Sequence, residues 1–351
     1  MAWVPVFLGW HLLTELAPGS GGTRLQQGVA LALLVSFLHQ PLTFVLVYGD
    51  RRQFALHRRL FVWAPVVALA VSVLAAVRNW WIVVPFAALW NLQHTLQQRY
   101  GVERIYGGRS GYGSARLDRA VSYVPMAVVL VALAATPSLP GLVRRSGLDP
   151  RNAQGVALLG AIRPAAVGLL VVTCAALAVV VVLWVRQERR AGPRANPAKW
   201  LYQASSLALV GSILVDPVAG FIAYVTAHAL EYAVIVDRTA KRRYGAANGA
   251  VAVAVAVAGD GGGGRGGGGG GGGLLGTLAR RRGGRVAFLA GIVLVAFAVD
   301  HLVHGVAFNV VVLTVGALHF TYDAVIWKLR RPAVARDLGA VPGAAAALSG
   351  V

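Results

Sequence analysis

Four histidines lie singly within apolar stretches, where an ionisable side chain is costly and therefore marks a functional position. They are His39, His94, His228 and His319. Each precedes an arginine by 10 to 12 residues, which corresponds to about 15–18 Å along a helix. Four imidazoles at one depth on parallel helices can converge on a point, and neutral imidazole binds iron, zinc or manganese. We therefore predict an intramembrane metal site with these four ligands.

Polar side chains follow three of these histidines by one helical turn, which places them on the same helix face. They are Gln98 after His94, Glu231 and Tyr232 after His228, and Asp323 after His319. Carboxylates beside a histidine either bind the metal or fix the tautomer of the ring that binds it. We predict that Glu231, Tyr232 and Asp323 are catalytic residues that orient ligands or move protons, with Gln98 as a reserve ligand.

Two further pairs of ionisable residues are also held in reserve as ligands. His11 and Glu15 lie one turn apart in the first apolar stretch, and His301 and His304 lie near the end of a later one. We interpret the second pair as an interfacial cluster at the membrane surface, with a second site or a proton entry point as alternatives.

The composition is typical of an integral membrane protein. Of 351 residues, 57% are hydrophobic and only 13% are charged, and the mean hydropathy is +0.65. Soluble proteins contain about 25% charged residues, so a soluble enzyme is excluded. The net charge of +20 would suggest nucleic-acid binding in a soluble protein, but in a membrane protein it indicates orientation, and no nucleic-acid partner is expected.

The hydropathy pattern predicts an all-α transmembrane helix bundle of about ten spans, with a range of about eight to ten. Alternating spans with a cytoplasmic N-terminus put most of the 33 Lys and Arg residues on the cytoplasmic side. We therefore predict a multi-pass protein of the cell (inner or plasma) membrane with both termini in the cytoplasm. The predicted spans are 3–17, 27–48, 60–77, 80–97, 120–136, 164–185, 200–215, 217–236, 286–302 and 305–327.

Residues 245–284 have a different composition from the rest of the chain. An Ala-Val alternation is followed by a glycine tract, which can neither bury a core nor hold a helix. We predict a disordered cytoplasmic linker here, between helices 1–8 in residues 1–244 and helices 9–10 in residues 285–331. A flexible cytoplasmic tail is expected over 332–351.

Several familiar motifs fail to account for the sequence. Histidine-box desaturases need several HxxxH or HxxHH clusters, which are absent, and no HExxH, Walker A or Asp-rich prenyl-diphosphate motif occurs. The stretch 108–111 (Gly-Arg-Ser-Gly) has the spelling of an intramembrane serine protease motif, but we predict that it lies in a basic loop outside the membrane.

The pattern resembles the Brp/Blh family of membrane β-carotene 15,15′-dioxygenases, polytopic proteins whose iron is held by histidines scattered over several helices. The resemblance rests on the four single histidines and on residues 319–323 (His-Phe-Thr-Tyr-Asp). The Pro-His-Gly-x-x-Asp element of the family is absent around His39, and its paired histidines one turn apart would correspond to His228 and Tyr232. The resemblance implies an iron cofactor and cleavage of a carotenoid by molecular oxygen.

The leading hypothesis is an iron-dependent oxygenase that acts on a lipid-soluble substrate, with zinc or manganese as alternative metals. Its expected partners are the lipid bilayer and a hydrophobic small molecule, and the oligomeric state is left open. A proton-coupled transporter that uses intramembrane His, Glu and Asp side chains is the main alternative. A haem-binding protein and a membrane protein without catalytic activity are further alternatives.

Overall fold

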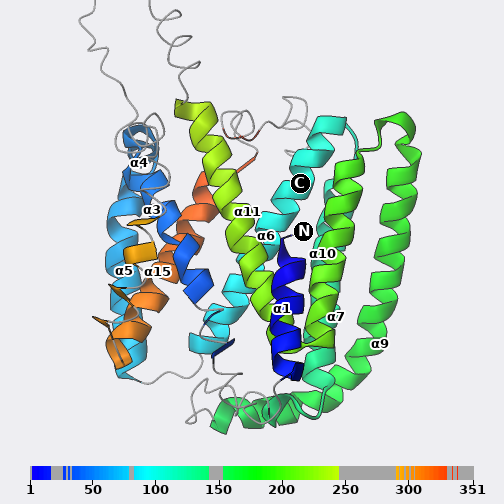
Figure 1. The fold of residues 1–351 in the computed structure, drawn as a ribbon, viewed down its shortest axis with the longest axis horizontal. Helices are drawn as coiled ribbons and strands as arrows, with labels where there is room; N and C mark the ends of the chain where they lie inside the picture. Colours follow the sequence, from blue (N-terminus) through cyan, green and yellow to red (C-terminus); the bar gives the residue numbers. More distant parts are fainter. Residues whose placement is uncertain are drawn as a thin grey trace, which may run out of the picture. The chain divides into compact units, whose positions relative to one another are not determined.

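The computed structural model describes residues 2–16, 27–28, 31, 34–78, 83–141, 153–244, 290–291, 293–295, 298–299, 302–303, 305–329, 334 and 338. All regular secondary structure among them is helical (Figure 1), which confirms the predicted all-α class. The predicted linker at 245–284 lies outside the described residues, as do His301, His304 and most of the predicted tail.

Five of the described helices are long and apolar enough to cross a membrane, as expected for a membrane protein. Shorter apolar helices cover Trp3–Leu13 and Leu34–Tyr48. The count of about ten spans stays a prediction. The five long apolar segments are Arg58–Val77, Ala115–Ala135, Val156–Arg190, Pro217–Ala240 and Gly305–Ile326.

The helices gather into two compact units, each with its own core. Unit 1 comprises Met1–Ser36, Trp81–Leu230 and Leu329–Val351, and unit 2 comprises Phe37–Trp80 and Glu231–Lys328. The division passes through α11 (Pro217–Tyr244), which is one continuous helix.

Unit 1 has a core formed where α6, α7, α10 and α11 meet. Leu96, Met126, Leu209 and Tyr224, one from each helix, are among the buried side chains of this core. The long helices α7 and α9 lie side by side (Figure 1). Besides the first half of α11, the helices of this unit are α1 (Trp3–Leu16), α6 (Val83–Ser110), α7 (Ala115–Ala135), α9 (Ala153–Arg190), the 3-10 turn η1 (Gly192–Arg194) and α10 (Pro197–Val215).

A tight corner joins α10 to α11. Asp216 caps the second helix, because its Oδ1 accepts hydrogen bonds from the backbone N–H groups of Val218 and Ala219, each at 3.0 Å. A Cβ atom added at Gly220 would lie only 2.6 Å from the backbone of Ile213. Glycine is therefore required here for the two helices to approach each other.

Helix α6 extends further than the sequence predicts. The predicted span ends at residue 97 and is followed by a basic loop, but the helix continues to Ser110. Arg99 and Arg104, expected on that loop, are each only 4% exposed. The prediction is wrong here because neighbouring helices supply buried partners: Arg99 donates to Ser206 on α10, and Arg104 donates to Asp118 on α7.

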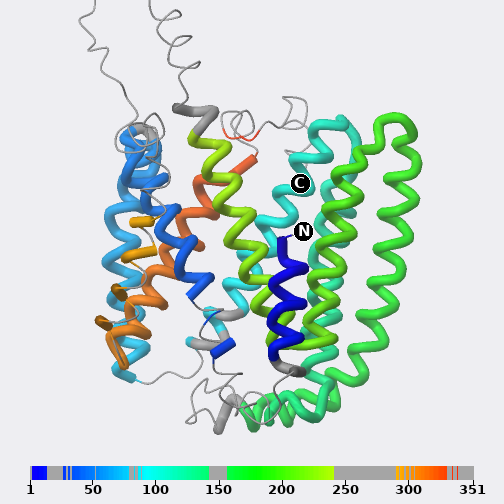
Figure 2. The backbone as a smooth tube through the Cα atoms, viewed as in Figure 1, coloured from blue at the N-terminus to red at the C-terminus, as the bar shows by residue number. Residues whose placement is uncertain are grey.

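Helix α9 is also longer than its predicted span of 164–185. It has 38 residues and contains Pro164. None of the residues in its most apolar stretch is buried within the protein. The beginning of the helix runs crosswise to the rest (Figure 2). A bend is expected near an internal proline because the ring removes one backbone hydrogen bond and clashes with the preceding turn.

Unit 2 is built around the pair α5 and α15, which lie side by side (Figure 1). Phe61 of α5 and Tyr322 of α15 are fully buried, and their ring centroids lie 5.0 Å apart in an edge-to-face arrangement. Pro41 occupies the first turn of α3, where its missing N–H has no helical acceptor to lose. Besides the second half of α11, the helices are α3 (Pro41–Tyr48), α4 (Arg51–Leu56), α5 (Arg58–Val77) and α15 (Gly305–Ile326).

Candidate metal centre

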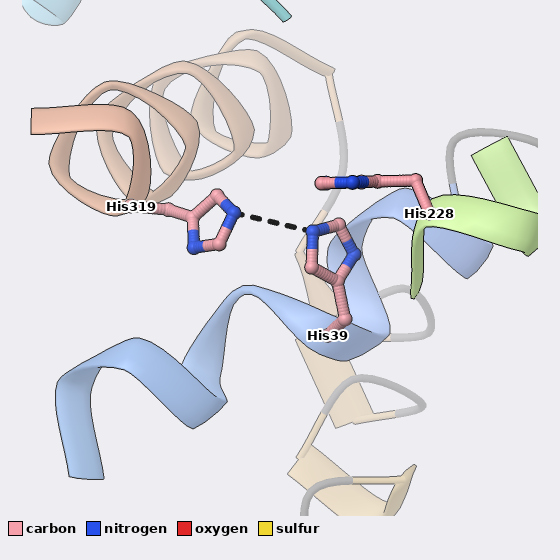
Figure 3. Close-up of side chains that lie close together, drawn as sticks. All are labelled: His39, His228 and His319. Atoms are coloured by element: carbon pink, nitrogen blue, oxygen red, sulfur yellow. Dashed lines mark hydrogen bonds between the residues drawn. The ribbon is translucent and has the colours of Figure 1, made fainter. Parts of the chain in front are cut away.

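Two of the four predicted histidine ligands meet in unit 2. His39, just before α3, and His319, on α15, are 3% and 0% exposed. Their Nε2 atoms lie 3.2 Å apart, and Figure 3 shows this contact as the dashed line between the two rings. The rings are nearly perpendicular, with centroids 4.8 Å apart. Although they are separated by 280 residues in the chain, they therefore point nitrogen atoms at one position.

Thr43 fixes the orientation of the His319 ring. Its Oγ1 lies 2.6 Å from His319 Nδ1 and 2.9 Å from Asp323 Oδ1. A carboxylate only accepts hydrogen bonds, so the single hydroxyl proton of the threonine is donated to Asp323. The threonine oxygen then accepts the proton on Nδ1 of His319. The same oxygen lies 2.5 Å from the hydroxyl of Tyr232, whose proton it shares with Asp323. This assignment satisfies the contacts of Thr43 and leaves Nε2 of His319, the atom that faces His39, with its lone pair.

Asp323 and Tyr232 complete the polar group around these rings. The hydroxyl of Tyr232, on α11, donates to Asp323 Oδ1 at 2.9 Å, and Trp327 Nε1 lies 3.4 Å from the same hydroxyl. The second oxygen of Asp323 lies 3.9 Å from His319 Nε2. One carboxylate oxygen is therefore engaged by hydroxyl groups, while the other faces the nitrogen atom that carries the lone pair.

The distance between the two imidazole nitrogens suits a shared metal ion. Two nitrogens bound at about 2.0–2.1 Å, with angles of about 90–110° at the metal, lie about 2.9–3.4 Å apart. The observed 3.2 Å between His39 and His319 falls within this interval. His39 and His319 belong to one group of buried side chains that could hold a metal ion, and His319 and Asp323 belong to another. Within each group the ligand atoms lie within 4.8 Å of one another. Imidazole with carboxylate is a donor set that suits iron, zinc or manganese.

The other two predicted histidine ligands meet in unit 1. His94 of α6 and His228 of α11 are 7% and 1% exposed, and their rings pack edge to face with centroids 5.2 Å apart. Gln98, one turn after His94, has a side-chain amide whose buried nitrogen and oxygen find no hydrogen-bond partner among the described residues. His228 lies one turn before Tyr232 on α11, so these two side chains share a helix face.

The remaining predicted site residues are placed as follows. Glu231 is half-buried on α11. His11 is in unit 1, where its Nδ1 lies 2.9 Å from Asp216 Oδ2 and its ring stacks on Phe7. The side chain of Glu15 lies outside the described residues, as do His301 and His304.

Thr43 is the residue of this site that sequence reasoning missed. Threonines are common in apolar helices, where the hydroxyl often bonds to the backbone of its own helix, so the residue type alone gives no signal. The only available hint was its position four residues after His39, which is the spacing of side chains on one helix face. Pro41 intervenes and weakened that hint.

No family model, curated protein or solved structure matches the chain. The resemblance to the Brp/Blh family therefore stays a prediction from the pattern of histidines.

Proposed function

We propose that this membrane protein is a metal-dependent enzyme, with His39, His319 and Asp323 as ligands of an iron ion and a lipid-soluble molecule as its substrate. The observation that carries the proposal is the 3.2 Å approach of two buried Nε2 atoms, one of which has its lone pair directed at the other. A buried imidazole pair needs a shared proton or a shared cation at this distance, and the adjacent carboxylate favours the cation.

Each side chain has a definite task in this proposal. His39 and His319 would hold the ion, and Thr43 would keep the His319 ring in the tautomer that binds it. Tyr232 would keep a hydroxyl proton on Asp323 Oδ1, leaving Oδ2 for the ion. Bound iron would supply the activation of molecular oxygen, the chemistry that the resemblance implies. The helices α11 and α15 are both apolar enough to lie in a bilayer, which supports a substrate delivered from lipid.

Metal analysis of the full-length protein purified in detergent tests the proposal. We expect stoichiometric iron, and we expect His319→Ala and His39→Ala to lose it. His57→Ala is the matched control, because this histidine lies at the start of α5 in the same unit, packs against Phe61 and is not a proposed ligand. Metal content that is absent from the wild type, or equal in the wild type and His319→Ala, would contradict the proposal.

Further variants distinguish the four-ligand prediction from a centre built by unit 2 alone. If all four histidines are ligands, His94→Ala and His228→Ala lose metal as His319→Ala does. A Soret band in the purified protein would instead identify haem. Oxygen consumption that depends on an added carotenoid, and that disappears in His319→Ala, would support the substrate class that the resemblance implies.

A further inference from the structure

A second buried polar cluster lies in unit 1, where four helix ends meet. It joins the C-terminal parts of α6 and α9 to the first turns of α7 and α10. Arg99 of α6 is also buried, but its resolved contacts are with α10. The cluster itself contains five charged or ionisable side chains that are at most 4% exposed. They are Glu103, Arg104, Asp118, Glu188 and Lys199.

Most of these groups are arranged as ion pairs. Lys199 Nζ donates to Asp118 Oδ1 at 2.8 Å and to Glu188 Oε1 at 2.7 Å, and Arg104 donates to Asp118 Oδ2. The ammonium group of Lys199 also lies 5.7 Å from the ring centre of Trp184. Two cations and two carboxylates therefore compensate one another in the interior.

Glu103 is the fifth member and has only neutral hydrogen-bond partners in the described residues. Its Oε1 accepts from Trp184 Nε1 at 3.2 Å, and the same N–H is shared with Asp118 Oδ1 at 3.2 Å. Its Oε2 lies 2.9 Å from the hydroxyl of Ser122. If Glu103 were ionised, the cluster would contain a third carboxylate beside two cations, and such an uncompensated buried charge is costly.

Ser122 gives Glu103 only weak support for an ionised form. Its hydroxyl donates to Glu103 Oε2 and to the backbone carbonyl oxygen of Asp118, each at 2.9 Å. Because a serine has a single hydroxyl proton, these two acceptors share it. The hydrogen bonds of Glu103 are therefore too few to offset the cost of burying its charge.

One further buried cation lies near these helix ends, and the contacts resolved for it are made with α10. Arg99, one turn before Glu103, donates to Ser206 Oγ at 3.2 Å and lies over the ring of Tyr202. The other arginines on these four helix ends and on the connections between them are exposed, and they are Arg109, Arg116, Arg119, Arg186, Arg189, Arg190 and Arg194.

We propose that Glu103 is a proton-binding site, which holds a proton at neutral pH and releases it under alkaline conditions, so that the cluster changes its net charge by one. Burial, together with the neighbouring Asp118 carboxylate, raises the pKa of Glu103 to about 8. The site lies in unit 1 and uses none of the residues of the candidate metal centre. It therefore gives the protein a proton donor and acceptor of its own.

Infrared difference spectroscopy of the full-length protein, titrated with alkali, tests this proposal. We expect the carbonyl absorption of a buried protonated carboxyl group at neutral pH, its loss with a midpoint near pH 8, and its absence in Glu103→Gln. The glutamine is a close mimic of the protonated acid, because its amide can donate to Ser122 and accept from Trp184. Asp323→Asn is the control, since it removes another buried carboxyl group and should leave this absorption in place.

A second measurement tests the proposal without relying on the assignment of an infrared absorption to Glu103. The melting temperature of the wild type should fall between about pH 6 and about pH 9, and Glu103→Gln should abolish most of that fall. An absorption that persists in Glu103→Gln, or a melting temperature with the same pH dependence in both proteins, would overturn the proposal.

Discussion

Replacing Asp118 by asparagine should destabilise unit 1 strongly. This carboxylate accepts hydrogen bonds from Arg104, Lys199 and Trp184, and it is fully buried. The asparagine keeps the size of the side chain but removes its charge. Two buried cations would then face Glu188 as the only remaining ionised carboxylate of the cluster, which leaves one positive charge without compensation.

The size of the effect follows from what the cluster can do in response. Removing one partner of a buried ion pair costs about 3–5 kcal/mol of unfolding free energy, because the remaining charge stays buried. Glu103 can offset part of this loss by giving up its proton once the neighbouring negative charge is gone. We therefore expect about 3 kcal/mol for Asp118→Asn, and about 5 kcal/mol for the double variant with Glu103→Gln, in which that response is blocked.

Chemical unfolding in detergent, followed by tryptophan fluorescence, measures both values. Asp216→Asn is the matched control, because asparagine caps a helix as well as aspartate and this side chain is partly exposed. It should lose at most about 1 kcal/mol, the value expected for a partly exposed pair with His11. The reasoning fails if Asp118→Asn loses no more than the control, or if the double variant is no less stable than Asp118→Asn.

Three more predictions concern packing and pH. Gly220→Ala should lower the melting temperature markedly, because the new methyl group meets the backbone of Ile213, whereas Gly211→Ala on α10 meets nothing within 4 Å and should be neutral or stabilising; equal melting temperatures would contradict this. Phe61→Ala should cost about 3–5 kcal/mol of unfolding free energy, since a buried aromatic ring is lost from the core; a loss below about 1 kcal/mol would show that the site collapses. The raised pKa of Glu103 stabilises the folded state fully below its ordinary value of 4.5, and this stabilisation is lost as the pH rises through about 8. At about pH 9, the free energy of unfolding of Glu103→Gln should therefore exceed that of the wild type by at most about 5 kcal/mol.

The sequence predicted the helical class and the burial of the histidines because both depend on local composition. His39, His94, His228 and His319 all have exposures of 7% or less. An imidazole within an apolar helix is costly to expose to lipid, so it faces the interior of the protein. Its burial can therefore be inferred without knowledge of the neighbouring helices. The pairing of His39 with His319 agrees with their similar spacing to a following arginine, 12 residues to Arg51 and 11 residues to Arg330.

The partners of individual charges could not be predicted in the same way. Arg104 and Lys199 lie outside the predicted spans, where the positive-inside pattern treats them as orientation signals on loops. Both are instead buried in ion pairs. An arginine or lysine at the cytoplasmic surface and one paired inside the protein are the same residue types, and they occur at similar positions in a helix. Only the carboxylates of Asp118 and Glu188, brought from other helices, distinguish the two cases, and their approach depends on the tertiary fold.

The internal proline of α9 has a consequence for how the protein meets bilayers of different thickness. The helix has 38 residues, or about 57 Å at 1.5 Å per residue, which is nearly twice a hydrocarbon core of about 30 Å. The part from Pro164 to Arg190 is about 40 Å long, enough to cross the core with some tilt. The crosswise beginning of the helix (Figure 2) can then take up hydrophobic mismatch by changing its angle at the proline. The packing of α7 against the rest of α9 would then stay unchanged when the angle at the proline changes.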